Sequence, residues 1–440
     1  MTKPVGFRWN EREHVLLARF AFKWLLLAAP MAALVGAACA FFLWALDRAT
    51  ATRLAQSWLL FLLPLAGVGI VALYGAFGRD AERGNNLLMD AIHNADPTIE
   101  HSDSAVIVPR RMAPLVLVAT VLTHLFGGST GREGTAVQMG GSIASGMGRA
   151  LRLDRADLRL LLMAGIAAGF GGVFGTPLAG TVFALEVLAV GQMRYEALIP
   201  CLIGGLVGDW ASSACGSHHT HYSVGANPHA LLNPLLAGKV ALASLAFGLA
   251  SMLFAELTHA LGKLWKRIPQ PLLRPVAGGC VIIALTLLLG TRDYLGLSVG
   301  LRSAPISPGS VTLQSCFVVG GVSLLSWWWK LLFTSVTLSS GFKGGEVTPL
   351  FFIGAALGNV LGHALGAPVD LFAALGFVGV FAGATNTPLA CTLMGLELFG
   401  SSYAPYFALT CVLSYLFSGS SGIYTAQRVG VPKLGVKDMS

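Results

Sequence analysis

Charged residues are scarce in this 440-residue chain, where Asp, Glu, Lys and Arg make up only 11% of the sequence. A typical soluble domain has about 25%, so a soluble enzyme is excluded. Hydrophobic residues reach 55%, and the apolar stretches 24–46 and 58–77 are as long as the roughly 20 residues that cross a hydrocarbon core. The composition therefore predicts an all-α, multi-pass membrane protein.

Three further patterns are missing. No ten-residue alternation of polar and apolar residues indicates a membrane barrel. The seven cysteines are scattered without a CxxC motif, so neither disulfides nor a cysteine-based metal site is expected. Cys215, His218, His219 and His221 are metal-ligand types, but no second cluster completes a site. We predict a solvated loop there, with no metal and no cofactor.

Charge of one sign dominates the polar segments. The net charge is +8, from 29 Lys and Arg against 21 Asp and Glu, and the positive residues gather in stretches such as 3–23 and 263–274. This pattern orients a membrane protein and does not indicate nucleic-acid binding, because positive segments stay in the cytoplasm. The first apolar run is too long for a signal peptide. We expect a plasma-membrane protein with both termini in the cytoplasm.

Two blocks of the sequence repeat at nearly one offset. Gly131-Arg-Glu-Gly-Thr135 recurs as Gly344-Gly-Glu-Val-Thr348, and adding 213 to the number of Glu133 gives Glu346. Thr176-Pro-Leu-Ala179 recurs as Thr387-Pro-Leu-Ala390 at an offset of 211. An internal repeat is a strong indication of architecture. The chain is predicted to consist of two homologous halves.

The halves are predicted to be membrane repeats, 1–225 and 226–440. Apolar segments at 114–126, 161–173 and 389–399 are short and interrupted by Gly, Pro or Thr. Broken helices in repeated halves are typical of transporters, with the site at the interface between the repeats. Similarity alone does not distinguish inverted from parallel repeats.

Glu133 and Glu346 are the candidate chemical groups. Each lies in a Gly-rich motif between long apolar segments, where a carboxylate costs several kcal/mol unless it is paired or hydrated. We interpret them as groups for proton transfer or ion gating. The alternatives are carboxylates at loop ends near the headgroups, or carboxylates neutralised by Arg132 and Lys343.

The same Gly-rich motifs begin apolar segments, so each predicts a helix N-terminus. Such an end binds anions through unpaired N–H groups and the positive end of the helix dipole. Thr135 and Thr348 follow the two carboxylates. Their hydroxyls either donate to an anion or cap the helices, and the spacing leaves both open.

Other motifs allow weaker hypotheses. Residues 127–131 match G-x-S-x-G around Ser129, with His124 nearby, but a nucleophile elbow needs an α/β-hydrolase sheet that this composition excludes. No enzymatic activity is expected. Glu186 and Glu397 are symmetry mates that could relay protons or cap helices. The run from Trp327 to Lys330 is interpreted as an interfacial anchor.

Four motifs resemble the CLC family of anion channels and anion/proton antiporters. They are Gly131-Arg-Glu-Gly134, Gly175-Thr-Pro-Leu-Ala179, Ser340-Gly-Phe-Lys-Gly-Gly345 before Pro349, and Asn386-Thr-Pro-Leu-Ala390. The resemblance implies two inverted-topology repeats of broken and tilted helices, and a homodimer with one pore per subunit. It also implies that Glu133 is the gating, proton-carrying carboxylate. No cytoplasmic regulatory domain is expected after Tyr424.

The departures from the chloride-type pattern are informative. Gly84-Asn-Asn-Leu-Leu88 stands where chloride-type members have a serine motif, and Thr135 replaces the usual proline. The second-half motif is Gly345-Glu-Val-Thr-Pro349, and Val187 aligns with the inner proton-pathway glutamate. This combination resembles the fluoride/proton antiporter branch.

That branch implies export of fluoride across the cell membrane in exchange for protons, with Glu346 in proton coupling. A chloride/proton antiporter or anion channel of the same fold is the alternative. The expected partners are fluoride, protons, membrane lipid and a second copy of the chain, with no nucleic acid. The predicted anion-binding residues combine side chains and helix-end N–H groups: Asn85, Gly131, Arg132, Gly134, Val347, Thr348 and Tyr424.

Overall fold

The chain is helical throughout the part that the structure describes. This computed structural model describes all residues except 1–10, 96–105, 220–221, 226–232, 300–308 and 434–440. Within the described residues there are fifteen α-helices, and the only strands form one short parallel pair. The predicted all-α class is confirmed. The proposed boundary at 225/226 borders residues outside the described part, and both chain ends lie outside it.

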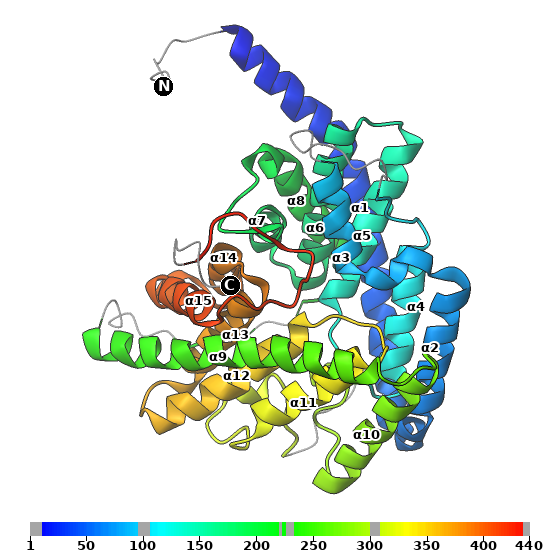
Figure 1. Ribbon diagram of the computed structural model, residues 1–440. Helices are drawn as coiled ribbons and strands as arrows, with labels where there is room; N and C mark the ends of the chain where they lie inside the picture. The colour runs from blue at the N-terminus through cyan, green and yellow to red at the C-terminus, as the bar shows by residue number, and fades with distance from the viewer. Residues whose placement is uncertain (1–10, 96–105, 220–221, 226–232, 300–308, 434–440) are drawn as a thin grey trace.

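The first half contains eight of the helices (Figure 1). They are α1 (Glu11–Ala55), α2 (Leu63–Phe77), α3 (Asn85–Asn94), α4 (Met112–Leu125), α5 (Glu133–Ala150), α6 (Arg155–Phe174), α7 (Pro177–Glu186) and α8 (Leu198–Ala214).

The second half contains the other seven helices. They are α9 (Pro234–Trp265), α10 (Leu273–Leu289), α11 (Ser326–Ser339), α12 (Val347–Ala364), α13 (Val369–Thr385), α14 (Pro388–Phe399) and α15 (Ala404–Phe417). Strand β1 (Ala189–Val190) pairs in parallel with β2 (Arg428–Val429), so the end of the chain returns to the first half.

The helices are uneven in length, as broken helices predict. Among the described residues, six helical segments are long and apolar enough to cross a membrane, whereas α7 has 10 residues and α14 has 12. The short apolar segment 161–173 lies within a longer helix, because α6 begins at Arg155 and has 20 residues. Its first turn is polar and is capped by Asp154, which accepts from Asp157 N at 2.7 Å, so hydropathy alone misses this turn.

The core lies where α6, α12 and α13 pack together. Residues Val369–Thr385 of α13 are almost all buried. Phe351 of α12 stacks on Phe377 of α13, with ring centroids 3.9 Å apart. Phe170 of α6 stacks on Phe381 of α13 at 6.3 Å, which joins the two halves. These aromatic contacts surround the place where the two repeated Gly-rich motifs meet.

Lys330 is not the interfacial anchor that the sequence suggested. Its side chain is fully buried in α11. The ammonium group donates to Tyr294 O at 3.2 Å, Gly296 O at 2.7 Å and Ser298 Oγ at 2.9 Å. An ammonium group has three donors, so these acceptors satisfy it without interfacial water.

Close contact between α12 and α13 predicts a stability effect at Gly354. A Cβ at this position would lie 1.9 Å from Gly376 O, so Gly354→Ala must force the helices apart. We expect a loss of about 1–3 kcal/mol in unfolding free energy, measured by thermal unfolding in detergent. Gly69→Ala in α2 is the matched control, since nothing lies within 4 Å of its Cβ and alanine favours the helix. Equal stability of the two variants would contradict this packing.

Candidate functional site

The N-termini of α5 and α12 meet at the interface between the halves. Gly131 and Gly345 form an antiparallel bridge, with N–O distances of 2.6 and 2.9 Å. A Cβ on Gly345 would lie 2.7 Å from Gly134 N, so only glycine permits this approach. The prediction that both motifs begin helices is confirmed, because α5 starts at Glu133 and α12 at Val347.

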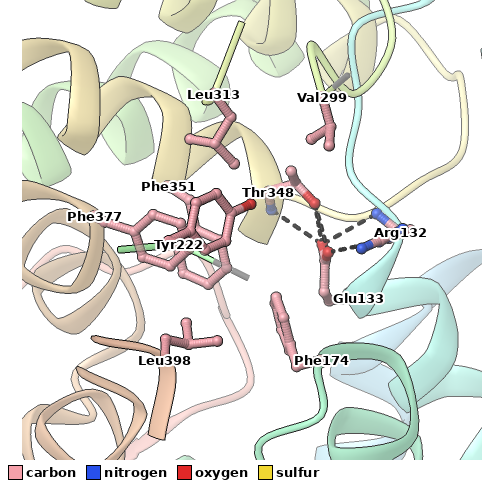
Figure 2. A pocket seen from close by; sticks show the side chains of 10 residues that line it. All are labelled: Arg132, Glu133, Phe174, Tyr222, Val299, Leu313, Thr348, Phe351, Phe377 and Leu398. Atoms are coloured by element: carbon pink, nitrogen blue, oxygen red, sulfur yellow. Dashed lines mark hydrogen bonds and ion pairs between the residues drawn. The ribbon is translucent and has the colours of Figure 1, made fainter. Parts of the chain in front are cut away.

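The Glu133 carboxylate lies on the N-terminus of α12 (Figure 2). It accepts hydrogen bonds from the Thr348 hydroxyl at 2.5 and 2.6 Å, from Thr348 N at 3.0 Å and from Arg132 N at 3.1 Å. Only 1% of Glu133 is exposed, so it is not a solvent-exposed carboxylate at the end of a loop. A helix N-terminus favours negative charge, and here a carboxylate from the opposite half supplies that charge.

Arg132 provides only part of the compensation for this charge. Its Nε lies 3.4 Å from Glu133 Oε1, longer than the usual length of a charge-assisted hydrogen bond. The Thr348 contacts are shorter and come from two donor groups of one residue. The donors that hold Glu133 therefore belong mainly to α12.

The two threonines differ in role. The Thr348 hydroxyl donates to the Glu133 carboxylate, which is one of the two possibilities that the spacing left open. The Thr135 hydroxyl instead pairs with Thr120 Oγ1 of α4 at 2.8 Å. Thr135 neither caps α5 nor contacts the carboxylate through any hydrogen bond within the described residues.

Glu346 and Asn85 converge beside Gly134. A Cβ at Gly134 would lie 3.2 Å from Asn85 Nδ2 and 3.3 Å from Glu346 Oε2. Within the described part of the chain, Glu346 Oε2 and Asn85 Oδ1 are buried without a hydrogen-bond partner. While Glu346 is ionised, both of these oxygens can only accept hydrogen bonds, so they cannot bond to each other. A proton on Glu346 would supply the missing donor.

Tyr424 reaches the same place from the C-terminal segment. Its side chain is buried, and two residues further on Ala426 N donates to Asn86 Oδ1, next to Asn85, at 2.9 Å. The predicted residues thus come from four separate stretches of sequence. The structure places Asn85, Glu133, Glu346 and Thr348 around the junction of α5 and α12, and Tyr424 lies in the segment that contacts the start of α3.

A pocket extends from Glu133 into an aromatic cluster (Figure 2). Sequence reasoning missed its aromatic lining. Phe351 lies one helical turn after Thr348, which could have indicated it, but no local signal marks the others. The pocket is lined by Arg132, Glu133, Phe174, Tyr222, Val299, Leu313, Thr348, Phe351, Phe377 and Leu398.

Ser129 and His124 do not form a nucleophile and base pair. Ser129 Oγ shares a hydrogen bond with Thr334 Oγ1 at 3.0 Å. The ring nitrogens of His124 contact Thr120 O at 2.8 Å and Thr130 O at 3.2 Å. The histidine therefore holds the loop that leads into α5.

The Cys and His run does not gather into a metal site. Within the described residues, no group of three or more Cys, His, Asp or Glu side chains could hold a metal ion. His219 Nε2 lies 3.3 Å from Asp209 Oδ1, and its Nδ1 lies 3.2 Å from Val173 O. His221 lies outside the described residues.

Glu186 and Glu397 cap helices of opposite halves. Glu186, at the end of α7, accepts from Leu389 N at 3.1 Å and Ala390 N at 2.9 Å, at the start of α14. Glu397 of α14 accepts from Leu178 N at 2.9 Å and Ala179 N at 2.8 Å, at the start of α7. This reciprocal exchange is what a two-fold relation between the halves predicts.

Comparisons with known proteins agree with the fold. The family model described as voltage gated chloride channel matches residues 66–419. The chain belongs to the voltage gated chloride channel family, or CLC family. A chloride/fluoride channel protein of Pseudomonas syringae pv. tomato is 47% identical to this CLC chain, over 97% of the chain and 91% of that relative.

Solved CLC structures are similar over almost the whole chain. A CLC-type fluoride/proton antiporter has 34% sequence identity and a TM-score of 0.84, covering 96% of this chain and 100% of the other. A slow cyanobacterial Cl⁻/H⁺ antiporter has 19% identity and a TM-score of 0.72, covering 91% and 96%. The second likeness shows the fold alone. The predicted CLC-type fold is confirmed.

The reciprocal caps of this CLC chain predict the effect of Glu186→Gln and Glu397→Gln. Each substitution removes the negative charge that faces a helix N-terminus. Such a contact contributes up to about 2 kcal/mol to stability when it is partly buried. We expect each variant to unfold at a lower temperature in detergent than the wild-type protein. Unchanged unfolding temperatures in both variants would contradict the capping role.

Proposed function

We propose that the protein is a fluoride/proton antiporter that exports fluoride across the cell membrane in exchange for protons. The observation that carries this proposal is the Glu133 carboxylate on the N-terminus of α12. The donors around it form an anion site that is occupied by the protein's own anion. An external anion can bind there once the carboxylate leaves.

Protonation of Glu133 allows fluoride to take the place of the carboxylate. A neutral carboxyl is held less strongly by the α12 dipole and by Thr348, so fluoride replaces it on the same N–H and hydroxyl groups. When fluoride leaves and Glu133 ionises, the carboxylate returns. Because each substrate favours a different position of one side chain, the movements of proton and anion are coupled.

Fluoride is favoured by the density of hydrogen-bond donors. It is small, strongly hydrated and a strong acceptor, so a site must replace its water with well-placed donors. The proposed donors are the Thr348 hydroxyl and N–H, the Arg132 N–H, the Asn85 amide and the Tyr424 hydroxyl. The N–H groups of Gly131, Gly134 and Val347 complete the proposed anion-binding set. Similarity to a CLC-type fluoride/proton antiporter supports this choice over a chloride transporter; the relative called a chloride/fluoride channel protein names both anions.

Glu346 is the proposed second group of the proton path. Its unpartnered Oε2 lies beside Asn85 and against Gly134, the residue that follows Glu133. It can therefore hold a proton next to the anion site. Because Val187 stands where the inner proton-pathway glutamate is expected, Glu346 is the proposed replacement for that glutamate.

The membrane supplies the driving force. A negative-inside potential favours anion exit by about 2.3 kcal/mol per charge per 100 mV, and an inward proton gradient adds to it. We propose that the protein confers fluoride resistance in the plasma membrane, with both termini in the cytoplasm. Cells without the gene should retain fluoride.

A homodimer in the lipid bilayer completes the proposal. Helix α7 has 10 residues, about 15 Å of helix, against a hydrocarbon core of about 30 Å. Its Leu178 and the symmetry-related Leu389 of α14 are 45% and 50% exposed. A second copy covering these short helices would keep their ends out of lipid. We also propose that the two repeats comprise residues 1–225 and 226–440.

The carboxylate assignments predict different transport defects. In liposomes with an imposed pH gradient and no fluoride gradient, wild-type protein should drive fluoride uphill, as recorded by a fluoride electrode. Glu133→Gln should abolish this proton-driven movement, because the side chain no longer ionises, and Glu346→Gln should impair it. Chloride efflux from the same liposomes is the control for selectivity. Normal uphill fluoride transport in both variants would contradict the assignments.

A further inference from the structure

The segment that follows α15 crosses from one half of the protein to the other. In Figure 1 it is the red segment that passes from the region of α14 and α15 toward α3 and α7. Ile423 N donates to Ala384 O at 2.9 Å in the second half. Arg428 N donates to Leu188 O at 3.2 Å in the first half. We call residues 423–433 the C-terminal strap, and Tyr424 is part of it.

Gln427 makes the central contacts of the C-terminal strap. Its Nε2 donates to Val187 O and to Thr385 O, each at 2.9 Å. Its Oε1 accepts from Asn386 Nδ2 at 2.8 Å. The amide side chain therefore uses both donor hydrogens and its oxygen, and it ties the end of α7 to the end of α13.

The partner residue Asn386 is itself held in an unusual conformation. It ends α13 in the left-handed region, with φ 58° and ψ 40°. Asparagine tolerates this region better than most residues, and its side chain faces Gln427. Gln427 N also donates to Tyr424 O at 3.2 Å. Gln427 is thus bonded to Tyr424, to the first half and to the second half at once.

The C-terminal strap also touches the helix that carries Asn85. Ala426 N donates to Asn86 Oδ1 of α3 at 2.9 Å. A shift of the strap would therefore move Tyr424 and disturb the start of α3 together. Both are parts of the proposed anion site.

We propose that Gln427 is a positioning residue for Tyr424, and that its three side-chain hydrogen bonds to the two halves set the preference for fluoride over chloride. Fluoride needs closely placed donors more than the larger chloride does. Movement of the Tyr424 hydroxyl would therefore weaken the binding of fluoride more than the binding of chloride. This inference rests on the proposed function, in which Tyr424 contacts the anion.

The test compares Gln427→Met with Lys433→Met in liposomes. Methionine keeps the length of Gln427 and removes all three bonds. Lys433 anchors the same strap by donating to Tyr415 O at 2.6 Å and Ser418 Oγ at 2.9 Å, contacts that lie within the second half. We expect Gln427→Met to lower the ratio of fluoride to chloride efflux about tenfold, which corresponds to roughly one hydrogen bond, while Lys433→Met keeps the wild-type ratio.

Two more variants keep the result interpretable. Asn386→Gly retains the left-handed conformation and removes one hydrogen bond to Gln427. It should also lower the ratio of fluoride to chloride efflux. This variant takes the place of Gln427→Met if that protein does not fold. Tyr424→Phe is the reference for a lost hydroxyl. A lowered ratio in Tyr424→Phe with wild-type ratios in Gln427→Met and Asn386→Gly would overturn the positioning role and leave the proposed function standing.

Two other outcomes also overturn the inference. An equal loss of selectivity in Lys433→Met would show that general anchoring of the strap, and not Gln427, sets the ratio. Absence of fluoride preference in the wild-type protein would instead refute the proposed function itself.

Discussion

The contact between the Glu133 carboxylate and the N-terminus of α12 is the interaction on which the rest of the structure depends. It requires a buried charge and a helix end from opposite halves of the chain to meet within hydrogen-bond distance. That approach is possible only because Gly131, Gly134 and Gly345 leave room for the backbones to touch. The proposed anion site follows from this contact, since the donors that face the carboxylate would face a bound anion in the same way.

Three connections between the halves hold this junction in place. The loop before α5 is clamped by Thr130, whose hydroxyl donates to Gly345 O at 2.9 Å. Glu186 and Glu397 each cap a helix of the other half. The C-terminal strap joins both halves through Gln427. The site is therefore assembled by long-range contacts, and the proposed exchange of a proton for an anion would move one side chain without separating the repeats.

Much of the fold and the key carboxylate could be predicted from the sequence, because they leave local or repeated signals. Hydropathy indicates the membrane helices, and Glu133 is conspicuous as a charge within an apolar repeat motif. The buried state of Lys330 could not be predicted, since its acceptors are backbone carbonyls from a distant loop. Tyr222 and Gln427 were missed for the same reason: their neighbours come from other parts of the chain, and no pattern in their own segments marks them.

The central claim is that ionised Glu133 and fluoride compete for the same donors, and fluoride binding to purified protein tests it most directly. Titration calorimetry would compare wild-type protein with Glu133→Gln over a range of pH. The account predicts that wild-type affinity for fluoride rises as the pH falls, because protonation frees the donors on α12. Glu133→Gln should bind fluoride more tightly than wild type at high pH and change less with pH. The same affinity and the same pH dependence in both proteins would contradict the account.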